Sequence, residues 1–513
     1  GLVGSEMCIR DRYYMKNILN KKLLWALPLA FSLTVSSCSD FLDKIPENSV
    51  EVESVDYSNT ANMYMPVSGI YAKSRNLLAA WSTYGCLLVR GDDVDKGGSP
   101  TDQMEYEYAS KFQYGQLSSF WALNGTWQNY YNVISLVNSA LSSLDNYAQH
   151  LTSENDKQLN AQYQAEARFF RALAYFYLVN LWGDVPILVD NQELGIFRSP
   201  KEDVLQYMYD ELDYCIANLP AIRPNESSHP GAVTKYTAET LKAKVKMYNN
   251  EWEDVLALTN NIIDSGKFEL YNDFYELFKI PGKLCNESLL EYQFTDFGTG
   301  SGDIVQSDNW FSFQGPRGEA PISGWAFMEP TQKIQDLFTK RGETVRAETT
   351  FLKTGETTRD GDYIQPATGE EPTVYNGKAY TPANQMTEGR LNYGDNNNIR
   401  VFRYADVLLM NAEARVRLGQ SGDAPLNLVR ERAGMAPLTN ATLDQILEER
   451  QVELAVEWGE RFFDLVRTDR ATQELDGFVK GEHEYYPIPQ DQIDLNANLE
   501  ADPVPFESET ASE

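Results

Sequence analysis

Histidine and cysteine side chains, which carry much of the metal and nucleophilic chemistry of proteins, are scarce and scattered in this chain. The 513 residues include three histidines, His150, His229 and His483, and none is spaced for a shared metal ion. No HExxH motif and no Walker phosphate-binding loop is present. The glycine-rich stretch 298–302 fits neither the dinucleotide fingerprint nor the G-x-S-x-G nucleophile elbow, and we interpret it as a loop. The sequence therefore predicts no metal centre and no cofactor.

One acidic run resembles the start of a calcium-binding loop. Asp92, Asp93 and Asp95 precede Gly97, but the twelfth position counted from Asp93 is Met104, where an EF-hand needs a bidentate glutamate. A solvated acidic turn explains the run better than a metal site does. Paired carboxylates for glycoside hydrolysis stay open as an alternative, because 75 Asp and Glu residues offer many pairs and nothing in the sequence selects two.

The N-terminal segment has to be set aside before the fold is considered. Residues 1–14 resemble the translated adapter of a sequencing library, so we expect an assembly artefact and a start at Met15. Three lysines and the apolar run 23–35 then form a secretion signal too short to span a bilayer. The small residues before Cys38 match a lipobox, which predicts a signal peptide over 15–37 and a lipid-anchored mature chain from Cys38.

The three further cysteines of the predicted mature chain, Cys86, Cys215 and Cys285, are widely spaced. They predict buried thiols and no disulfide framework. The formal charge of -31 argues against a nucleic-acid partner, because a phosphate backbone needs a basic surface. The same acidity favours neutral or cationic cargo over sulfated or uronic-acid polymers.

Hydrophobic periodicity predicts helices in two blocks, 55–267 and 399–470, around a loop-rich insert at 268–398. Apolar residues recur at three- and four-residue steps, which indicates amphipathic helices. The predicted helices cover 121–145, 161–182, 237–250, 252–264, 399–418, 423–433 and 442–458. Successive helical hairpins of similar length favour a tetratricopeptide-like repeat. Residues 490–513 are expected to form a poorly ordered acidic tail.

Several stretches together are similar to the SusD/RagB family of surface glycan-binding lipoproteins. They are spread over most of the predicted mature chain: 38–43, 127–138, 166–175, 181–186, 398–413, 428–434 and 448–465. Within them, the charged residues beside aromatic positions, such as Arg171 and Arg403, are interpreted as buried ion pairs that lock the helices together.

The resemblance implies a mostly α fold, in which a single domain over 38–513 carries an irregular ligand-binding region on a tetratricopeptide-like scaffold. It also implies a non-catalytic protein on the outer face of the outer membrane, which binds oligosaccharides or polysaccharides and delivers them to a SusC-type TonB-dependent transporter. Two alternatives stay open: peptide or other nutrient cargo in the same kind of system, and a secreted glycoside hydrolase.

The ligand residues of the family lie in variable loops, so candidates come from their placement in this chain. Aromatic rings suit sugars because the apolar C–H face of a pyranose stacks on a ring, while carboxylates and amides bind its hydroxyls. We therefore predict ligand contacts at Trp81, Asp92, Asp93, Trp310 and Trp325, with Tyr84 and Phe311 behind them.

Overall fold

The computed structural model describes residues 55–191, 195–296, 305–306, 309–318, 322–366, 373–386 and 396–506. Cys38, the signal segment and the glycine-rich stretch 298–302 lie outside these ranges. The described residues from Tyr57 onward belong to one compact unit.

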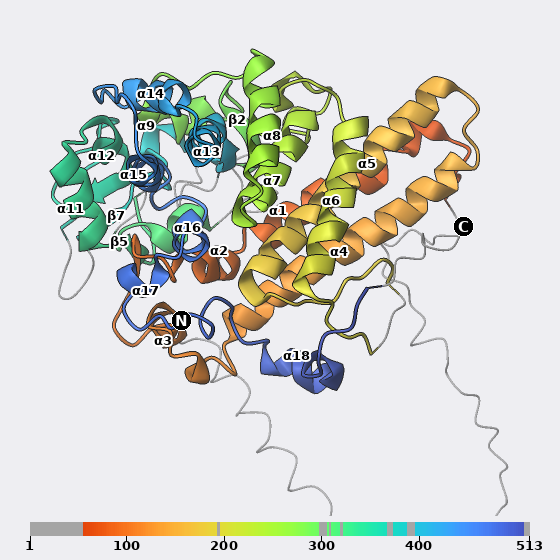
Figure 1. Cartoon of the computed structure of the whole chain (residues 1–513), viewed down its shortest axis with the longest axis horizontal. Helices are drawn as coiled ribbons and strands as arrows, with labels where there is room; N and C mark the ends of the chain where they lie inside the picture. The colour runs from red at the N-terminus through yellow and green to blue at the C-terminus, as the bar shows by residue number, and fades with distance from the viewer. Residues whose placement is uncertain are drawn as a thin grey trace, which may run out of the picture. The chain divides into compact units, whose positions relative to one another are not determined.

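The first helical block is an array in which the longer helices pack on one another in chain order (Figure 1). It contains α1 (Met65–Leu78), α2 (Trp81–Leu88), α3 (Met104–Ser110), α4 (Trp121–Ala148), α5 (Glu154–Trp182), α6 (Lys201–Asn218), α7 (Lys235–Tyr248) and α8 (Trp252–Asp264). Local signals fix the ends of the helices. Ser153 caps α5 by accepting a hydrogen bond from the Asp156 N–H, and Gly183 ends it with a φ of 74°.

The second block continues the array from α8 and confirms the predicted helical-repeat architecture. Its helices are α13 (Tyr404–Arg417), α14 (Asp423–Arg432), α15 (Leu443–Glu453), α16 (Glu460–Arg467), α17 (Ala471–Glu474) and α18 (Gln490–Leu495). Helix α13 packs against α8 on one side and against α14 and α15 on the other. The described fold is therefore mostly α, as predicted.

The insert between the blocks holds short helices and two-stranded antiparallel pairings. Its helices are α9 (Phe274–Leu277), α10 (Trp310–Gln314), α11 (Gln332–Arg341) and α12 (Val345–Thr350). Strand β1 (Val94–Gly97) pairs with β5 (Phe327–Pro330), β2 (Ser288–Tyr292) with β8 (Ile399–Arg403), β3 (Thr295–Asp296) with β4 (Val305–Gln306), and β6 (Phe351–Lys353) with β7 (Val374–Asn376). Two of these pairings, β1–β5 and β2–β8, tie the insert to the helical blocks.

Three predictions about local structure were wrong. Residues 399–403 form strand β8 rather than the first turn of a helix, because they pair with β2. Helix α15 ends at Glu453, and the backbone then turns through Val456, whose φ is 54°. Residues 490–506 are packed rather than poorly ordered: Asn496 donates to the Ile196 carbonyl at 2.7 Å, and the Val504 N–H donates to the Arg198 carbonyl at 2.8 Å.

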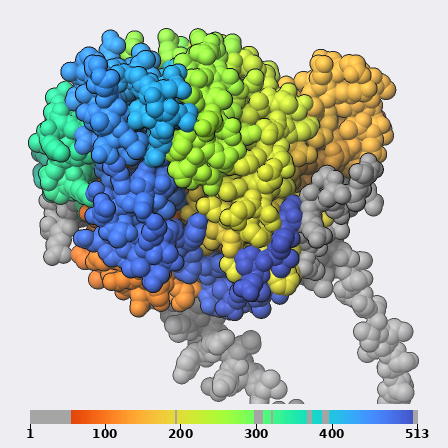
Figure 2. All heavy atoms as spheres, viewed as in Figure 1, coloured from red at the N-terminus to blue at the C-terminus, as the bar shows by residue number. Residues whose placement is uncertain are grey.

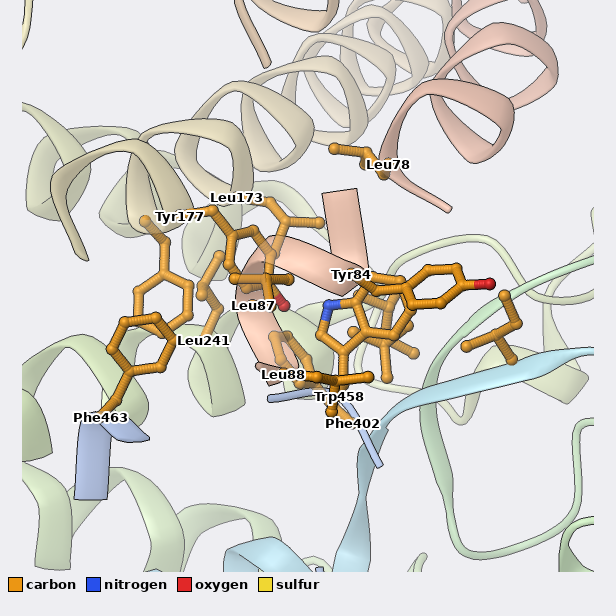
Figure 3. Packing of buried hydrophobic residues seen from close by; sticks show 14 of the residues in the cluster. Leu78, Tyr84, Leu87, Leu88, Leu173, Tyr177, Leu241, Phe402, Trp458 and Phe463 are labelled. Atoms are coloured by element: carbon orange, nitrogen blue, oxygen red, sulfur yellow. The ribbon is translucent and has the colours of Figure 1, made fainter. Parts of the chain in front are cut away.

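One hydrophobic core joins residues from both ends of the described chain. Figure 3 shows part of this cluster, which includes Leu78 of α1, Leu87 of α2, Leu173 of α5, Phe402 of β8 and Phe463 of α16. Each of these side chains is buried. Because this core joins both helical blocks and also contains insert residues such as Phe313 and Phe327, the insert and both blocks depend on one another for stability.

Buried ion pairs cross-link the same elements, as the sequence motifs predicted. Arg171 binds Glu211 through two nitrogens at 2.9 and 3.0 Å, which joins α5 to α6. Arg403 binds Glu457 in the same two-pronged way, at 2.8 and 2.7 Å, and also contacts Glu287 at 2.6 Å. A buried charge with several matched partners holds the backbone segments that carry those partners in fixed relative positions.

Candidate functional site: a tryptophan platform

Three tryptophans from separate segments meet at one place on the molecule. Trp81 begins α2, Trp121 begins α4, and Trp325 lies in the segment just before β5. The ring centroids of Trp81 and Trp121 are 4.8 Å apart at 62°, and those of Trp81 and Trp325 are 5.7 Å apart at 80°. Trp121 is 45% exposed, whereas Trp81 and Trp325 are half-buried. We call these three residues the tryptophan platform.

Buried aromatic rings hold the platform from behind. Phe313 of α10 lies 5.0 Å from Trp81 and 6.2 Å from Trp325, and it stacks on Phe327 at 5.0 Å and 11°. Such offset and edge-to-face contacts are worth about 0.5–1.5 kcal/mol each beyond the area they bury. The platform is therefore a rigid arrangement, which keeps the entropy cost of binding a ligand low.

A second layer of aromatic rings supports Phe313. Tyr84 is fully buried, 4.7 Å from Trp310 and 5.3 Å from Phe313, and its hydroxyl donates to the Asn309 carbonyl at 2.7 Å. Trp458, shown beside Tyr84 in Figure 3, lies 5.3 Å from Trp310. This layer joins α2, α10 and the segment after α15.

The pairing of β1 with β5 brings one polar loop to the platform. Gly97 pairs with Phe327, and a Cβ added at Gly97 would lie 2.5 Å from the Ala326 carbonyl oxygen, so this close approach requires glycine. The buried Lys96 amine donates to the carbonyls of Gly97, Ser99 and Asp102 at 2.9, 2.9 and 3.0 Å, which fixes the loop that follows. At the end of that loop, Gln103 accepts a hydrogen bond from Trp121 Nε1 at 3.0 Å.

The two aspartates predicted as ligand contacts are buried and bonded within the protein. The Asp92 carboxylate binds Arg461 at 2.5 and 3.0 Å and Lys333 at 2.7 Å. Burial opposes the ionisation of Asp92, but these two cations hold its pKa below the ordinary value. Asp93 accepts the Val456 N–H at 3.2 Å, and burial, reinforced by the charge of Asp92, raises its pKa to about 6. Both carboxylates thus fix the segment 456–461, which carries Trp458.

The predicted aromatic ligand contacts fall into two groups, half-buried residues and buried ones. Trp81 and Trp325 belong to the platform. Tyr84, Trp310 and Phe311 are buried, Phe311 lying 5.7 Å from Tyr380. Whether any of them contacts a ligand stays a prediction. The sequence reasoning missed Trp121, which it placed in a helix without noting that the first residue of a helix can escape the buried face.

Within the described ranges, no group of three or more His, Cys, Asp and Glu side chains is placed to hold a metal ion. Nor does any described helix combine the length and the apolar character needed to cross a membrane.

Two family models match this chain. The model described as "SusD family" matches residues 286–485, and the one described as "Starch-binding associating with outer membrane" matches residues 40–245. The chain belongs to the SusD/RagB family. The second match includes Trp81 and Trp121 of the platform, and the first includes Trp325.

Relatives of this SusD-family chain match it over nearly its full length. A SusD-like protein of Bacteroides ovatus is 26% identical, with 94% of this chain and 95% of the relative covered. SusD-like protein P2 of Formosa agariphila is 27% identical, with 91% and 96% covered.

Solved structures agree on the fold. A laminarin-binding SusD-like protein is 25% identical with a TM-score of 0.72, covering 85% of this chain and 97% of its own. Surface glycan-binding protein A from Bacteroides thetaiotaomicron, in complex with laminarihexaose, is 24% identical with a TM-score of 0.70, covering 85% and 97%.

Proposed function

We propose that this SusD-family chain is a non-catalytic cell-surface protein that binds neutral oligosaccharides on the tryptophan platform. The observation that carries the proposal is the meeting of Trp81, Trp121 and Trp325, which come from three segments and are partly open to solvent. Indole rings stack on the apolar C–H faces of pyranoses, and rings set at steep angles to one another suit a curved chain rather than a flat molecule.

Solved relatives of this fold support a glycan as the ligand class. One is named for binding laminarin, and another was solved with laminarihexaose. The acidity of this chain, with a formal charge of -31, favours neutral or cationic sugars over sulfated or uronic-acid polymers.

We further propose that the mature chain begins at Cys38, is lipid-anchored there on the outer face of the outer membrane, and forms one SusD-like domain. In this role it delivers its cargo to a SusC-type TonB-dependent transporter. The family description "associating with outer membrane" and the surface glycan-binding relatives support this location. Capture and release require no covalent step.

Affinity electrophoresis of the purified protein in gels containing laminarin, xyloglucan or starch tests the ligand class. We expect at least one of these polysaccharides to retard the wild-type protein, and the Trp81→Ala/Trp325→Ala variant to migrate as in a gel without polysaccharide. No retardation by a broad panel of neutral glycans, combined with tight binding of peptides, would favour the alternative cargo. New reducing ends released from the retarding polysaccharide would favour the hydrolase.

A further inference from the structure

A groove separate from the platform lies along helix α4, between that helix and α18. The volume of this groove is about 620 Å³. Its walls come from α4, from Pro186, Leu188, Gly195 and Ile196, and from α18 with the residues that follow it. Figure 1 places α18 beside α4, and Figure 2 shows α18 in dark blue against the yellow segment that follows α5. We call it the α4–α18 groove.

The lining of this groove is uncharged, which is unusual for so acidic a protein. None of the described residues that line it is an Asp, Glu, Lys, Arg or His. By contrast, the 510 Å³ cavity beside α11 and α15 is lined largely by charged side chains, among them Asp336, Lys340 and Glu448. A neutral lining offers no charged side chain to pair with an ionic ligand, so it suits a neutral one.

Two carboxamides in the groove are uncommitted. Gln128 and Asn132 are exposed on α4, and within the described residues neither side chain has a hydrogen-bond partner. They are four residues apart, so they lie one above the other on the same helix face. Between them Tyr131 contributes a half-buried ring, and Leu188 and the 78% exposed Leu495 add aliphatic surface. Amides beside apolar surface are the groups that bind the hydroxyls and C–H faces of a sugar.

The same face of α4 leads from the groove to the platform. Trp121 precedes Gln128 by seven residues, or two helical turns, so Trp121, Gln128 and Asn132 lie along one stripe. Eleven residues of α-helix span about 16 Å. The walls are held in place at this end, because Gln492 donates to Asn124 Oδ1 at 2.7 Å and Tyr131 donates to the Pro186 carbonyl at 3.0 Å.

We propose that the α4–α18 groove is an extended subsite, which binds the distal sugars of a neutral oligosaccharide whose other end lies on the tryptophan platform. This inference rests on the proposed glycan-binding function. It adds a length requirement: a chain long enough to pass along α4 gains the contacts with Gln128 and Asn132, and a short one does not.

Titration calorimetry with short and long oligosaccharides cut from the retarding polysaccharide tests the extended subsite. In the Gln128→Ala/Asn132→Ala variant we expect affinity for the long chains to fall roughly 25-fold, since each of the two lost hydrogen bonds accounts for about a fivefold change, and affinity for the short chains to stay unchanged. Asn146→Ala, a carboxamide on α4 outside the groove lining, is the matched control and should bind both as the wild type does. Alanine favours helix, so circular dichroism and melting temperature should be retained.

The extended subsite would be overturned if the double variant bound long chains as tightly as the wild type does. It would also be overturned if the variant lost the same factor in affinity for short chains as for long ones. In either case Trp121→Ala still reports on the platform, so the groove can fail while the proposed function stands. A double variant that binds all sugars normally but loses its transporter in co-purification would assign the groove to protein docking instead. A wild-type protein that no neutral polysaccharide retards would contradict both proposals.

Discussion

Trp81 and Trp121 meet edge to face with their ring centroids 4.8 Å apart, although one begins α2 and the other begins α4. Both therefore sit at the first residue of a helix, where a side chain can lie beyond the buried face. The loop from Lys96 to Gln103 completes this arrangement, because Gln103 accepts the hydrogen bond from the Trp121 indole N–H. The platform thus depends on two helix starts and on the β1–β5 pairing.

Arg403→Ala should strongly destabilise the fold. The variant leaves the buried carboxylates of Glu287, Glu453 and Glu457 without one of their cations, and breaking a buried ion pair typically costs about 3–5 kcal/mol. Urea unfolding measures this loss. Arg359→Ala is the control: Arg359 pairs with Asp273 at the surface, and such pairs contribute about 1 kcal/mol or less. Unchanged stability together with lost ligand binding would assign Arg403 to ligand recognition.

Asp92→Asn distinguishes two roles for Asp92: the ligand contact that the sequence predicts and the ion pairs that the structure shows. The variant removes the charge that pairs with Arg461 and Lys333, so we expect a loss of about 1–3 kcal/mol in unfolding free energy. Polysaccharide affinity should change little, because the carboxylate is buried against these cations. Normal stability with abolished binding would show instead that Asp92 contacts the ligand.

Glu166 should make stability fall as pH rises. Burial raises its pKa to about 7, against an ordinary value of 4.5, while Tyr71 donates to its carboxylate at 3.0 Å. Because the folded state holds the proton more tightly than the unfolded state, this contribution is complete below about pH 4.5 and is lost between about pH 4.5 and 7.

Glu166→Gln removes that titration. At pH 8 the variant should be more stable than the wild type, by an amount on the order of 1–3 kcal/mol, and near pH 4.5 the two should be similar. Guanidinium unfolding at both values measures the difference. A variant whose stability relative to the wild type is the same at both pH values would show that Glu166 titrates normally in the fold.

Gly97→Ala should disturb the platform through the backbone. Its φ is 61°, and the added Cβ would lie 2.5 Å from the Ala326 carbonyl oxygen, next to Trp325. We expect the unfolding free energy to drop by about 1–3 kcal/mol and polysaccharide affinity to drop with it. Gly115→Ala, where no heavy atom lies within 4 Å of the added Cβ, should leave both unchanged. Identical behaviour of the two variants would argue that β1–β5 tolerates a side chain at Gly97.

Local patterns predicted the helical architecture well because the helices carry their own signals. The apolar spacing and the Trp182-Gly183 ending of α5 needed no knowledge of distant residues. Strand β8 was mistaken for helix because its identity depends on β2, a segment far away in the sequence.

The site was predictable only in part, for a similar reason. Trp81 and Trp325 could be nominated from their type and their place outside the helix cores, but Trp121 could not, since its exposure depends on how α2 and α4 pack. Asp92 and Asp93 looked like free acids because their partners, Arg461, Lys333 and the Val456 N–H, lie hundreds of residues away.

Titration calorimetry of Trp121→Ala and Trp121→Phe, with the polysaccharide that retards the wild-type protein, tests the platform most directly. Trp121 is 45% exposed, so the melting temperature should stay close to that of the wild type. Loss of the ring should weaken binding roughly tenfold or more, and phenylalanine should restore part of it. Wild-type affinity in the alanine variant would contradict sugar binding on Trp81, Trp121 and Trp325.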